Sequence, residues 1–284
     1  MRACLVWLIA GCGFSSPPGA GADPTDPGPA GPGDPTDPTD PADPGSSGGS
    51  NGSAAARCDI SDPDLRLCLS FSGDRGAQDL VSPGHSVVIA SNITPIAGIT
   101  SGAAMAASFN QGSQVRLDEN RDFDVAQITF DFWMQAQGLP GHNKRFWMLD
   151  NNTEYAALYD EDGAVLCAIG NLAVKSSVAL PVGSWHHVAC TYGADHQLRV
   201  LIDGDVRGCG RIDPGIPQGG GDGVAIGASF AGGKFSENFL GGLDGVHVYA
   251  RALPPRELCT LLGKVGCNDQ CGNQGPQADP RPAP

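Results

Sequence analysis

Short apolar segments with a period of two, separated by glycine- and asparagine-rich turns, run through residues 58–271. In the clearest of them, four apolar side chains alternate with four others, the apolar set being Ile128, Phe130, Phe132 and Met134. Successive side chains of a strand point to opposite faces, so this pattern predicts a half-buried β-strand. Further strands are predicted at 164–169, 185–192, 198–202, 223–228 and 244–250.

Turn and helix signals support the same interpretation. Asp203-Gly204 follows one predicted strand and suits the positive φ angles of a type I′ hairpin turn. Only one helix is predicted, from Pro254 to Leu262, because prolines open it and Glu257 lies in its first turn. Many short strands with almost no helix are typical of an all-β antiparallel sandwich. We therefore predict one domain of this class over residues 58–271.

The first twelve residues, MRACLVWLIAGC, predict an export signal. The apolar run after Arg2 is too short to span a bilayer, which needs about 20 apolar residues, but it suits a signal peptide over residues 1–11. Its end, Ile9-Ala10-Gly11-Cys12, resembles the lipobox of bacterial lipoproteins, which implies a diacylglycerol on Cys12. Gly13 in place of Asp then favours the outer membrane, on its periplasmic face or at the cell surface. An ordinary signal peptide with a chance cysteine is the alternative.

Two segments outside the domain have a different composition. Residues 12–57 repeat Asp-Pro and end in a Gly/Ser-rich stretch. Such a segment cannot bury enough apolar surface to offset the entropy of ordering it. We predict a disordered tether that could hold the domain on the order of 100 Å from a lipid anchor. A low-complexity linker without a length requirement is the alternative. The proline-rich residues 272–284 are predicted to form a disordered tail.

Cysteine usage and charge limit the compartment and the partners. Ten cysteines are many for a cytosolic protein of 284 residues and indicate an oxidising compartment. The net charge of −14 would repel a phosphate backbone, so no nucleic-acid partner is expected. Without Cys4 and Cys12 an even number of cysteines remains, which fits disulfides whose pairing the sequence does not decide. The candidates are Cys58, Cys68, Cys167, Cys190, Cys209, Cys259, Cys267 and Cys271.

An ordered set of motifs resembles a known family. A W-x-H-V-A-x-T-Y strand begins at Trp185, a hairpin ends in Asp203-Gly204, and G-x-x-D-x-V-x-x-Y-x-R-x-L-x-x-x-E-L covers 241–258. Together with residues 65–84 and 106–135, this set resembles a laminin G-like domain of the concanavalin A-like lectin/glucanase superfamily. The resemblance covers nearly all of residues 58–263 and implies a jelly roll of two packed antiparallel sheets.

Catalysis of the glucanase type is not expected. Such enzymes hold two carboxylates about 5 Å apart, which on one strand requires an even spacing on one face. The chain has five glutamates, and the closest two, Glu154 and Glu161, are seven residues apart. The strand at 128–135 carries Asp131 alone. A zincin motif is absent, and Val88 stands where a nucleophile elbow starting at Gly84 needs glycine. We predict that the chain is not an enzyme, with a glycoside hydrolase as the least favoured function.

The histidines and acidic residues raise the question of a metal. His186 and His187 are adjacent on a predicted strand and point to opposite faces, so they are expected to be structural, as is His196. Calcium is a possible cofactor, because the resemblance implies a rim site made of Asp and Asn oxygens. Asp79 and Asp244 stand where related domains have acidic residues, and 150–152 with 160–162 form a second oxygen-rich group. Local turn hydrogen bonding is the alternative.

Two functional hypotheses remain open. The first is a non-catalytic, membrane-anchored binding module for glycan. Sugar binding needs an exposed aromatic platform beside polar groups, and Trp133 and Trp147 are the candidates, whereas Trp185 is expected in the core. The second is an adhesive or structural surface lipoprotein that binds another protein.

Overall fold

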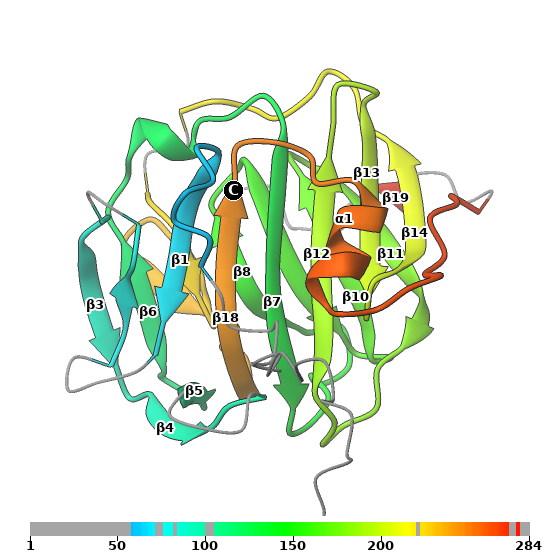
Figure 1. Cartoon of the computed structure of the whole chain (residues 1–284). Helices are drawn as coiled ribbons and strands as arrows, with labels where there is room; N and C mark the ends of the chain where they lie inside the picture. Colours follow the sequence, from blue (N-terminus) through cyan, green and yellow to red (C-terminus); the bar gives the residue numbers. More distant parts are fainter. Residues whose placement is uncertain are drawn as a thin grey trace, which may run out of the picture. The chain divides into compact units, whose positions relative to one another are not determined.

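The structure is a computed structural model that describes residues 58–71, 76–81, 84–99, 105–219, 222–272 and 277–278. These residues belong to one compact unit, 50–284. Residues 1–57 lie outside the described residues. They comprise the predicted signal peptide, Cys12 and the tether predicted for 12–57. Within the described part the chain is almost entirely β-structure (Figure 1).

The first layer is a nine-stranded sheet. Its main path runs β14 (Asp205–Arg211), β13 (Gln197–Ile202), β12 (His186–Tyr192), β7 (Ile128–Ala136), β18 (Gly241–Tyr249), β1 (Leu65–Ser70) and β2 (Gln78–Asp79). In addition, β5 (Met105–Phe109) pairs with the first residues of β18, and β4 (Thr94–Ala97) pairs with β5. All of these pairings are antiparallel.

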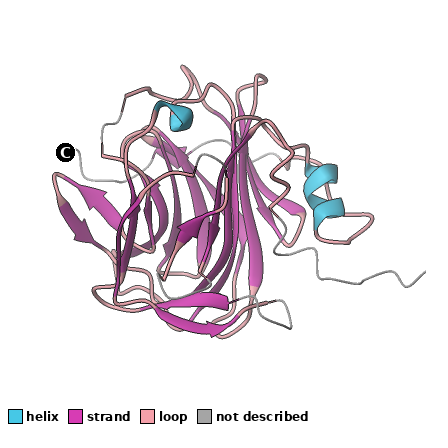
Figure 2. Ribbon diagram, turned by 60° about the vertical axis from the view of Figure 1, so that its left-hand side comes forward, coloured by secondary structure: helices cyan, strands magenta, loops and turns pink. Residues whose placement is uncertain are grey.

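The second layer is an eight-stranded antiparallel sheet (Figure 2). Its order is β19 (Gln277–Ala278), β11 (Leu172–Ala179), β10 (Ala164–Ile169), β9 (Tyr155–Asp160), β8 (Arg145–Asn151), β15 (Ala225–Ile226), β6 (Gln114–Leu117) and β3 (Val87–Ser91). A separate hairpin consists of β16 (Ser229–Ala231) and β17 (Lys234–Ser236). The described helices are a 3-10 turn at Arg121–Phe123 and α1 (Pro255–Leu261).

The main core lies between the two sheets. The apolar set of β7 predicted from its period, together with inward-facing residues of β9 and β10, is fully buried there. Phe130 of β7 stacks on Tyr155 of β9 with ring centroids 5.5 Å apart, which joins the layers through an aromatic contact. On the other face of the nine-stranded sheet, α1 lies over β12 and β13 (Figure 1), and Leu258 packs with Ala189 and Leu201 in a second, smaller cluster.

All eight cysteines of the predicted domain form disulfides, which confirms the candidates. The pairs are Cys58–Cys68, Cys167–Cys190, Cys209–Cys271 and Cys259–Cys267. Cys167–Cys190 joins β10 to β12 and so crosses the core from one sheet to the other. Cys209–Cys271 and Cys259–Cys267 hold the segment after α1 against β14 and the helix.

The predicted fold class is confirmed: a nearly all-β sandwich of two antiparallel sheets with one short helix. The predicted hairpin turn is also present, since Asp203 and Gly204 have φ angles of 52° and 89° and connect paired strands. The predicted strand at 223–228 is shorter, with only Ala225–Ile226 paired. Gln277–Ala278, which belong to the predicted tail, pair with β11.

Candidate functional site

The outer face of the nine-stranded sheet, the face turned away from the main core, gathers polar and aromatic side chains at its centre. It is defined by the side chains of Thr129, Asp131, Trp133 and Gln135 of β7, which alternate with the core residues of that strand. Antiparallel pairing places β12 and β18 on either side of β7, so side chains opposite these four share the same face. The strand alternation therefore assembles this surface from three segments that are far apart in the sequence.

Asp131 is the centre of a buried polar group on this face. Its Oδ1 lies 3.1 Å from Nε2 of His187 on β12 and 3.0 Å from Nδ1 of His247 on β18. Burial alone would raise the pKa of the Asp131 carboxyl, but the electrostatic interaction with His247 and the hydrogen bonds from both imidazoles outweigh it and hold that pKa well below its usual range. Asp131 is therefore an ionised side chain that fixes two imidazole rings.

A bulge in β18 brings His247 to this face. Asp244 pairs with Trp133 and His247 pairs with Asp131, although their odd spacing would put them on opposite faces of a regular strand. The register shifts between them, and Gly245 in that interval has a φ of 54°. An extra residue in one strand changes the face to which later side chains point. The bulge thus puts Asp244 and His247 on one surface.

Two half-buried tryptophans lie on the same face, near the end of β7 and the start of β12. Trp133 packs against His187, with ring centroids 5.3 Å apart and the rings edge to face. Trp185 lies over Gly242, where a Cβ would come within 2.7 Å of the indole. Gly242 pairs with Gln135, two residues along β7 from Trp133, so both indoles belong to the outer face. The expectation that Trp185 is a core residue is therefore replaced by a position on this surface.

Polar groups surround the two indoles. The Gln135 side chain donates to the carbonyl of Gly183 over 2.9 Å, which fixes the turn that leads to Trp185. Asp244 accepts from the backbone N–H of Ile99 over 3.2 Å, and this contact ties β18 to the segment after β4. Burial raises the pKa of the Asp244 carboxyl, and the backbone hydrogen bonds from Ile99 and Gly245 offset only part of this effect. We call Trp133, Trp185, Gln135, His187 and Asp244 the tryptophan patch.

Trp147, the other predicted aromatic platform, lies on the eight-stranded sheet. It is only 5 % exposed and packs with Ala156 and Leu158 on the face of that sheet away from the main core. Its Nε1 donates to Oε2 of Glu237 over 2.7 Å. A sugar ring could not stack on this indole unless the residues around it moved. Trp133 and Trp147 thus lie on different sheets, and Trp147 is not included in the proposed site.

The structure does not bring Asp79 and Asp244, the predicted calcium ligands, together. They lie on β2 and β18, with β1 between them. The Asp79 carboxylate accepts from the backbone N–H groups of Cys68, Val81 and His85 and lies 2.8 Å from His85 Nδ1. Asp79 thus makes the turn-type hydrogen bonds that were the alternative to calcium binding.

The second predicted oxygen-rich group is also separated. Asp160 and Asp162 both pair with Lys175 Nζ at 2.7 Å, at one end of β9. Asp150 pairs with Ala156 at the other end of β9, and its Oδ2 accepts from the backbone N–H of Phe230. The carboxylates predicted as one loop are therefore divided between the two ends of a strand.

Among the described residues, one group of at least three His, Cys, Asp or Glu side chains has potential ligand atoms that all lie within 4.8 Å of one another. It consists of Cys58, Cys68 and His247. Cys58 and Cys68 form a disulfide in this structure, so their sulfurs are not thiolate ligands here.

Each of the five glutamates has its own structural contact. Glu119 accepts from the N–H of Gly223, Glu154 from Asn151, Glu161 from the N–H of Asn143, Glu237 from Trp147, and Glu257 from Arg251. These contacts lie on different elements, so no two glutamates share one strand face as the two-carboxylate mechanism requires.

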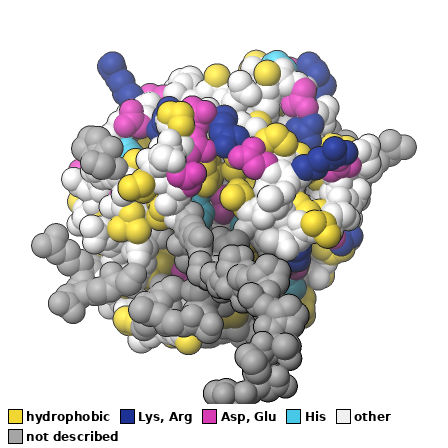
Figure 3. Space-filling view, viewed as in Figure 1, with side chains coloured by type: hydrophobic (Ala, Val, Ile, Leu, Met, Phe, Trp, Pro, Cys, Tyr) yellow, Lys and Arg dark blue, Asp and Glu magenta, His cyan; other side chains and the backbone are white. Residues whose placement is uncertain are grey.

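Charged side chains are visible on part of the outer face. Figure 3 shows Asp, Glu, Lys and Arg mainly in the upper half of this view. A pocket of about 350 Å³ is lined by residues including Leu65, Arg66, Val81 and His85, but by no tryptophan. The pocket and the tryptophan patch thus lie in different parts of the molecule.

None of the described helices is long and apolar enough to cross a membrane.

Comparison with solved structures finds the same fold in several proteins at low sequence identity. The binding domain of Paraclostridial Mosquitocidal Protein 1 is 16 % identical with a TM-score of 0.58, and the match covers 70 % of this chain and 52 % of that one. The botulinum neurotoxin serotype C1 binding domain is 12 % identical with a TM-score of 0.54, covering 72 % and 52 %. The chain therefore matches about half the length of these two structures.

A third similar structure is matched over nearly its whole length. Domain 4 of AbnA, a GH43 extracellular arabinanase from Geobacillus stearothermophilus in complex with arabinotriose, is 18 % identical with a TM-score of 0.52. The match covers 70 % of this chain and 98 % of that domain. No curated protein sequence matches the chain.

A family model gives the relationship at the level of sequence. The model described as "Concanavalin A-like lectin/glucanases superfamily" matches residues 109–259, which is more than half of the 284 residues. The matched region runs from the end of β5 to α1 and includes the strands that carry the tryptophan patch. The chain belongs to the laminin G-like family of the concanavalin A-like lectin/glucanases superfamily.

Proposed function

We propose that the chain is a non-catalytic glycan-binding module, displayed outside the cytoplasm on a lipid-anchored tether. The observation that carries the proposal is the pair of half-buried indoles, Trp133 and Trp185, on one sheet face beside polar side chains. Two of the similar structures are binding domains, and a third is an arabinanase domain in complex with arabinotriose. A sugar has apolar C–H faces and polar hydroxyl edges, which aromatic rings beside hydrogen-bonding groups complement.

The preformed geometry of the patch supports binding. The Trp133 ring is held by His187, which is fixed in turn by Asp131. Trp185 is positioned by the turn that Gln135 holds and by the absence of a side chain at Gly242. Rings that are already fixed lose little conformational freedom when a ligand stacks on them. Non-catalytic binding is further supported by the separate structural contacts of the five glutamates.

A glycan array with the full chain tests the binding function. We expect selective binding that Trp133→Ala and Trp185→Ala each weaken at least tenfold. Val265→Ala, which changes an apolar side chain that is 96 % exposed beyond α1, is the matched control and should bind as the unchanged chain does. Near-UV circular dichroism confirms that each variant is folded. A blank array with a folded chain would refute glycan binding and would favour the adhesive surface lipoprotein that binds another protein.

The anchor is tested separately on Cys12. Cells that express the full chain are labelled with a fatty acid and partitioned in detergent. We expect label and detergent partitioning in the unchanged chain and neither in Cys12→Ser. The subcellular fraction that contains the labelled chain tests the proposed outer-membrane location. Equal labelling of both forms would exclude acylation at Cys12 without affecting the glycan proposal.

A further inference from the structure

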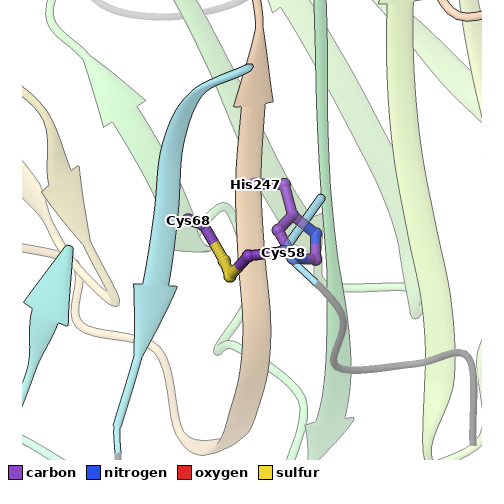
Figure 4. Close-up of side chains that lie close together, drawn as sticks. All are labelled: Cys58, Cys68 and His247. Atoms are coloured by element: carbon purple, nitrogen blue, oxygen red, sulfur yellow. A yellow bond between two sulfur atoms is a disulfide. The ribbon is translucent and has the colours of Figure 1, made fainter. Parts of the chain in front are cut away.

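His247 lies beside the Cys58–Cys68 disulfide on the outer face of the nine-stranded sheet. Figure 4 shows its imidazole next to the two cysteines, with Cys68 on β1 and Cys58 on the segment that precedes that strand. Cys68 pairs with His247 in the β1–β18 ladder, and the Cα atoms of Cys58 and Cys68 are 5.9 Å apart. The two sulfurs and a ring nitrogen of His247 all lie within 4.8 Å of one another.

The two nitrogens of His247 have different environments. Nδ1 lies 3.0 Å from the Asp131 carboxylate. Nε2 is buried and has no hydrogen-bond partner among the described residues, and the whole residue is only 7 % exposed. A buried polar atom without a partner costs free energy, so such an atom in a folded protein calls for an explanation. A carboxylate on one imidazole nitrogen with the other left free is the arrangement that metal-ligating histidines have in proteins.

We propose that Cys58, Cys68 and His247 form a redox-gated site for Zn²⁺, which is closed while the disulfide is present and opens when it is reduced. A dithiol reductant passes two electrons and two protons to the disulfide; the S–S bond breaks, both cysteines become thiols, and the reductant becomes its own disulfide. Zn²⁺ then binds both sulfurs as thiolates and releases the two thiol protons to solvent. His247 Nε2 supplies a third ligand through its lone pair.

The ligand chemistry selects the metal. Two thiolates and one imidazole suit Zn²⁺ and not the hard cations Ca²⁺ and Mg²⁺, which prefer oxygen ligands. In a tetrahedral zinc site the ligand atoms lie roughly 3.5–4 Å apart, because Zn–S bonds are about 2.3 Å and Zn–N bonds about 2.0–2.1 Å. The three potential ligand atoms already lie within 4.8 Å of one another, so the group has about the size of a zinc site once the disulfide is reduced. Water would complete the coordination, as it does in sites with three protein ligands.

Asp131 acts in this site as a positioning residue. Its carboxylate holds Nδ1–H of His247, which leaves Nε2 as the metal-binding nitrogen and fixes the ring plane. His187 holds the same oxygen from the other side, so the carboxylate does not depend on the metal for its orientation. The histidine ligand is therefore positioned before any metal arrives. It stands on these contacts alone and does not rest on the glycan proposal.

Cobalt is the probe for the experiment, because Co²⁺ bound to thiolates in a tetrahedral site has characteristic absorption bands. The full chain is reduced with a phosphine, which takes oxygen from water to become the phosphine oxide and leaves two thiols per disulfide. Co²⁺ is then titrated, and Zn²⁺ is used to displace it. The same procedure is applied to Cys58→Ser/Cys68→Ser, which keeps the other eight cysteines of the full chain and so subtracts any signal from them.

The expected result is one thiolate-bound Co²⁺ more in the reduced chain than in the double variant, and none of this signal before reduction. His247→Gln should weaken binding at least 100-fold. Asp131→Asn should weaken it about 10–100-fold with the shape of the absorption bands retained, as is typical of a residue that supports a ligand. An equal Co²⁺ signal in the reduced chain and the double variant, or unchanged affinity in His247→Gln, would overturn the proposal.

Loss of the disulfide could by itself unfold the domain, and near-UV circular dichroism of Cys58→Ser/Cys68→Ser detects this. In that case refolding becomes the measured quantity. Zn²⁺ must restore the native spectrum of the reduced chain, and it must fail to restore that of reduced His247→Gln. Equal recovery of both, or recovery of neither, contradicts the proposal.

Discussion

His247 Nδ1 lies 3.0 Å from Asp131 Oδ1 across the β7–β18 ladder, in a part of the sheet where both side chains are less than a tenth exposed. Because the folded-state pKa of Asp131 is depressed, its ionised carboxyl stabilises the fold above the unfolded pKa of about 4, and this contribution is lost as the pH falls toward the folded value. We therefore expect the domain to lose stability in acid as the Asp131 carboxyl becomes protonated.

Asp131→Asn tests this contribution. At pH 7 it should lower the free energy of unfolding by about 3–5 kcal/mol, because it leaves two buried imidazoles without their carboxylate. The difference from the unchanged chain should narrow as the pH falls from 5 to 2. Urea unfolding at several pH values measures both effects. Asp118→Asn, at a side chain that is 60 % exposed, should change little at any pH, and a pH-independent difference for Asp131→Asn would contradict the assignment.

Gly242→Ala should displace the Trp185 ring. The new methyl group would lie 2.7 Å from the indole and 3.0 Å from Ile96 Cδ1, so the side chains must move away while the backbone of β18 stays in place. We expect a loss of about 1–2 kcal/mol in unfolding free energy and a red shift in tryptophan fluorescence as the indole becomes more exposed. Gly272→Ala, where no heavy atom lies within 4 Å of the new methyl group, is the control. The shift should disappear in a Trp185→Phe background, and its persistence there would refute the cause given.

Trp147→Phe should affect stability and leave ligand binding unchanged. The substitution removes the Nε1–H that bonds to Glu237 and should lower the free energy of unfolding by about 1–2 kcal/mol. A double-mutant cycle with Glu237→Ala should give a coupling of about 1 kcal/mol. Weaker glycan binding in a fully folded Trp147→Phe chain would instead restore the predicted platform role of this residue.

The disulfide between the sheets should contribute more stability than the short one beside α1. Cys167–Cys190 closes a loop with a sequence separation of 23 residues, and removing it with a double alanine substitution should lower the unfolding free energy by about 3 kcal/mol. Cys259–Cys267, with a separation of 8, should contribute about 2.5 kcal/mol or less. Urea midpoints of the two double variants measure the order, and the reverse order would show that strain or residual structure outweighs loop entropy.

The alternation of apolar and polar residues predicts the sheet architecture, but it does not predict which side chains meet at the candidate site. The alternation in β7 correctly separated Trp133 from the core side chains, because side-chain direction along a regular strand follows from spacing alone. The same rule would put Asp244 and His247 on opposite faces of β18. It does not apply there, because the bulge at Gly245 reverses the face to which the later side chains point. A glycine inside a strand pattern is a signal for such a bulge and was the available clue.

Trp185 and Trp147 differ in how far a local pattern could have placed them. Trp185 is two residues from His187, which pairs with Trp133, so strand alternation places it on the same face as Trp133, and the expectation of a core position is wrong. Trp147 follows a turn that suggests exposure, but Glu237 accepts its indole N–H from a position 90 residues farther along the chain. Burial by a distant segment leaves no periodic trace in the sequence around the buried residue. The contact of His247 with Cys58 and Cys68 likewise joins residues that are far apart in the sequence.

The Cys58–Cys68 disulfide also determines how the domain would bear a mechanical load. A pull from the N-terminal side reaches Cys58 first and passes through the disulfide to Cys68 in β1, which is paired with β18 on one edge and β2 on the other. The intervening residues carry no tension. A load from that side would therefore reach an internal strand, hydrogen-bonded along both edges, before it reached any free end of the sheet.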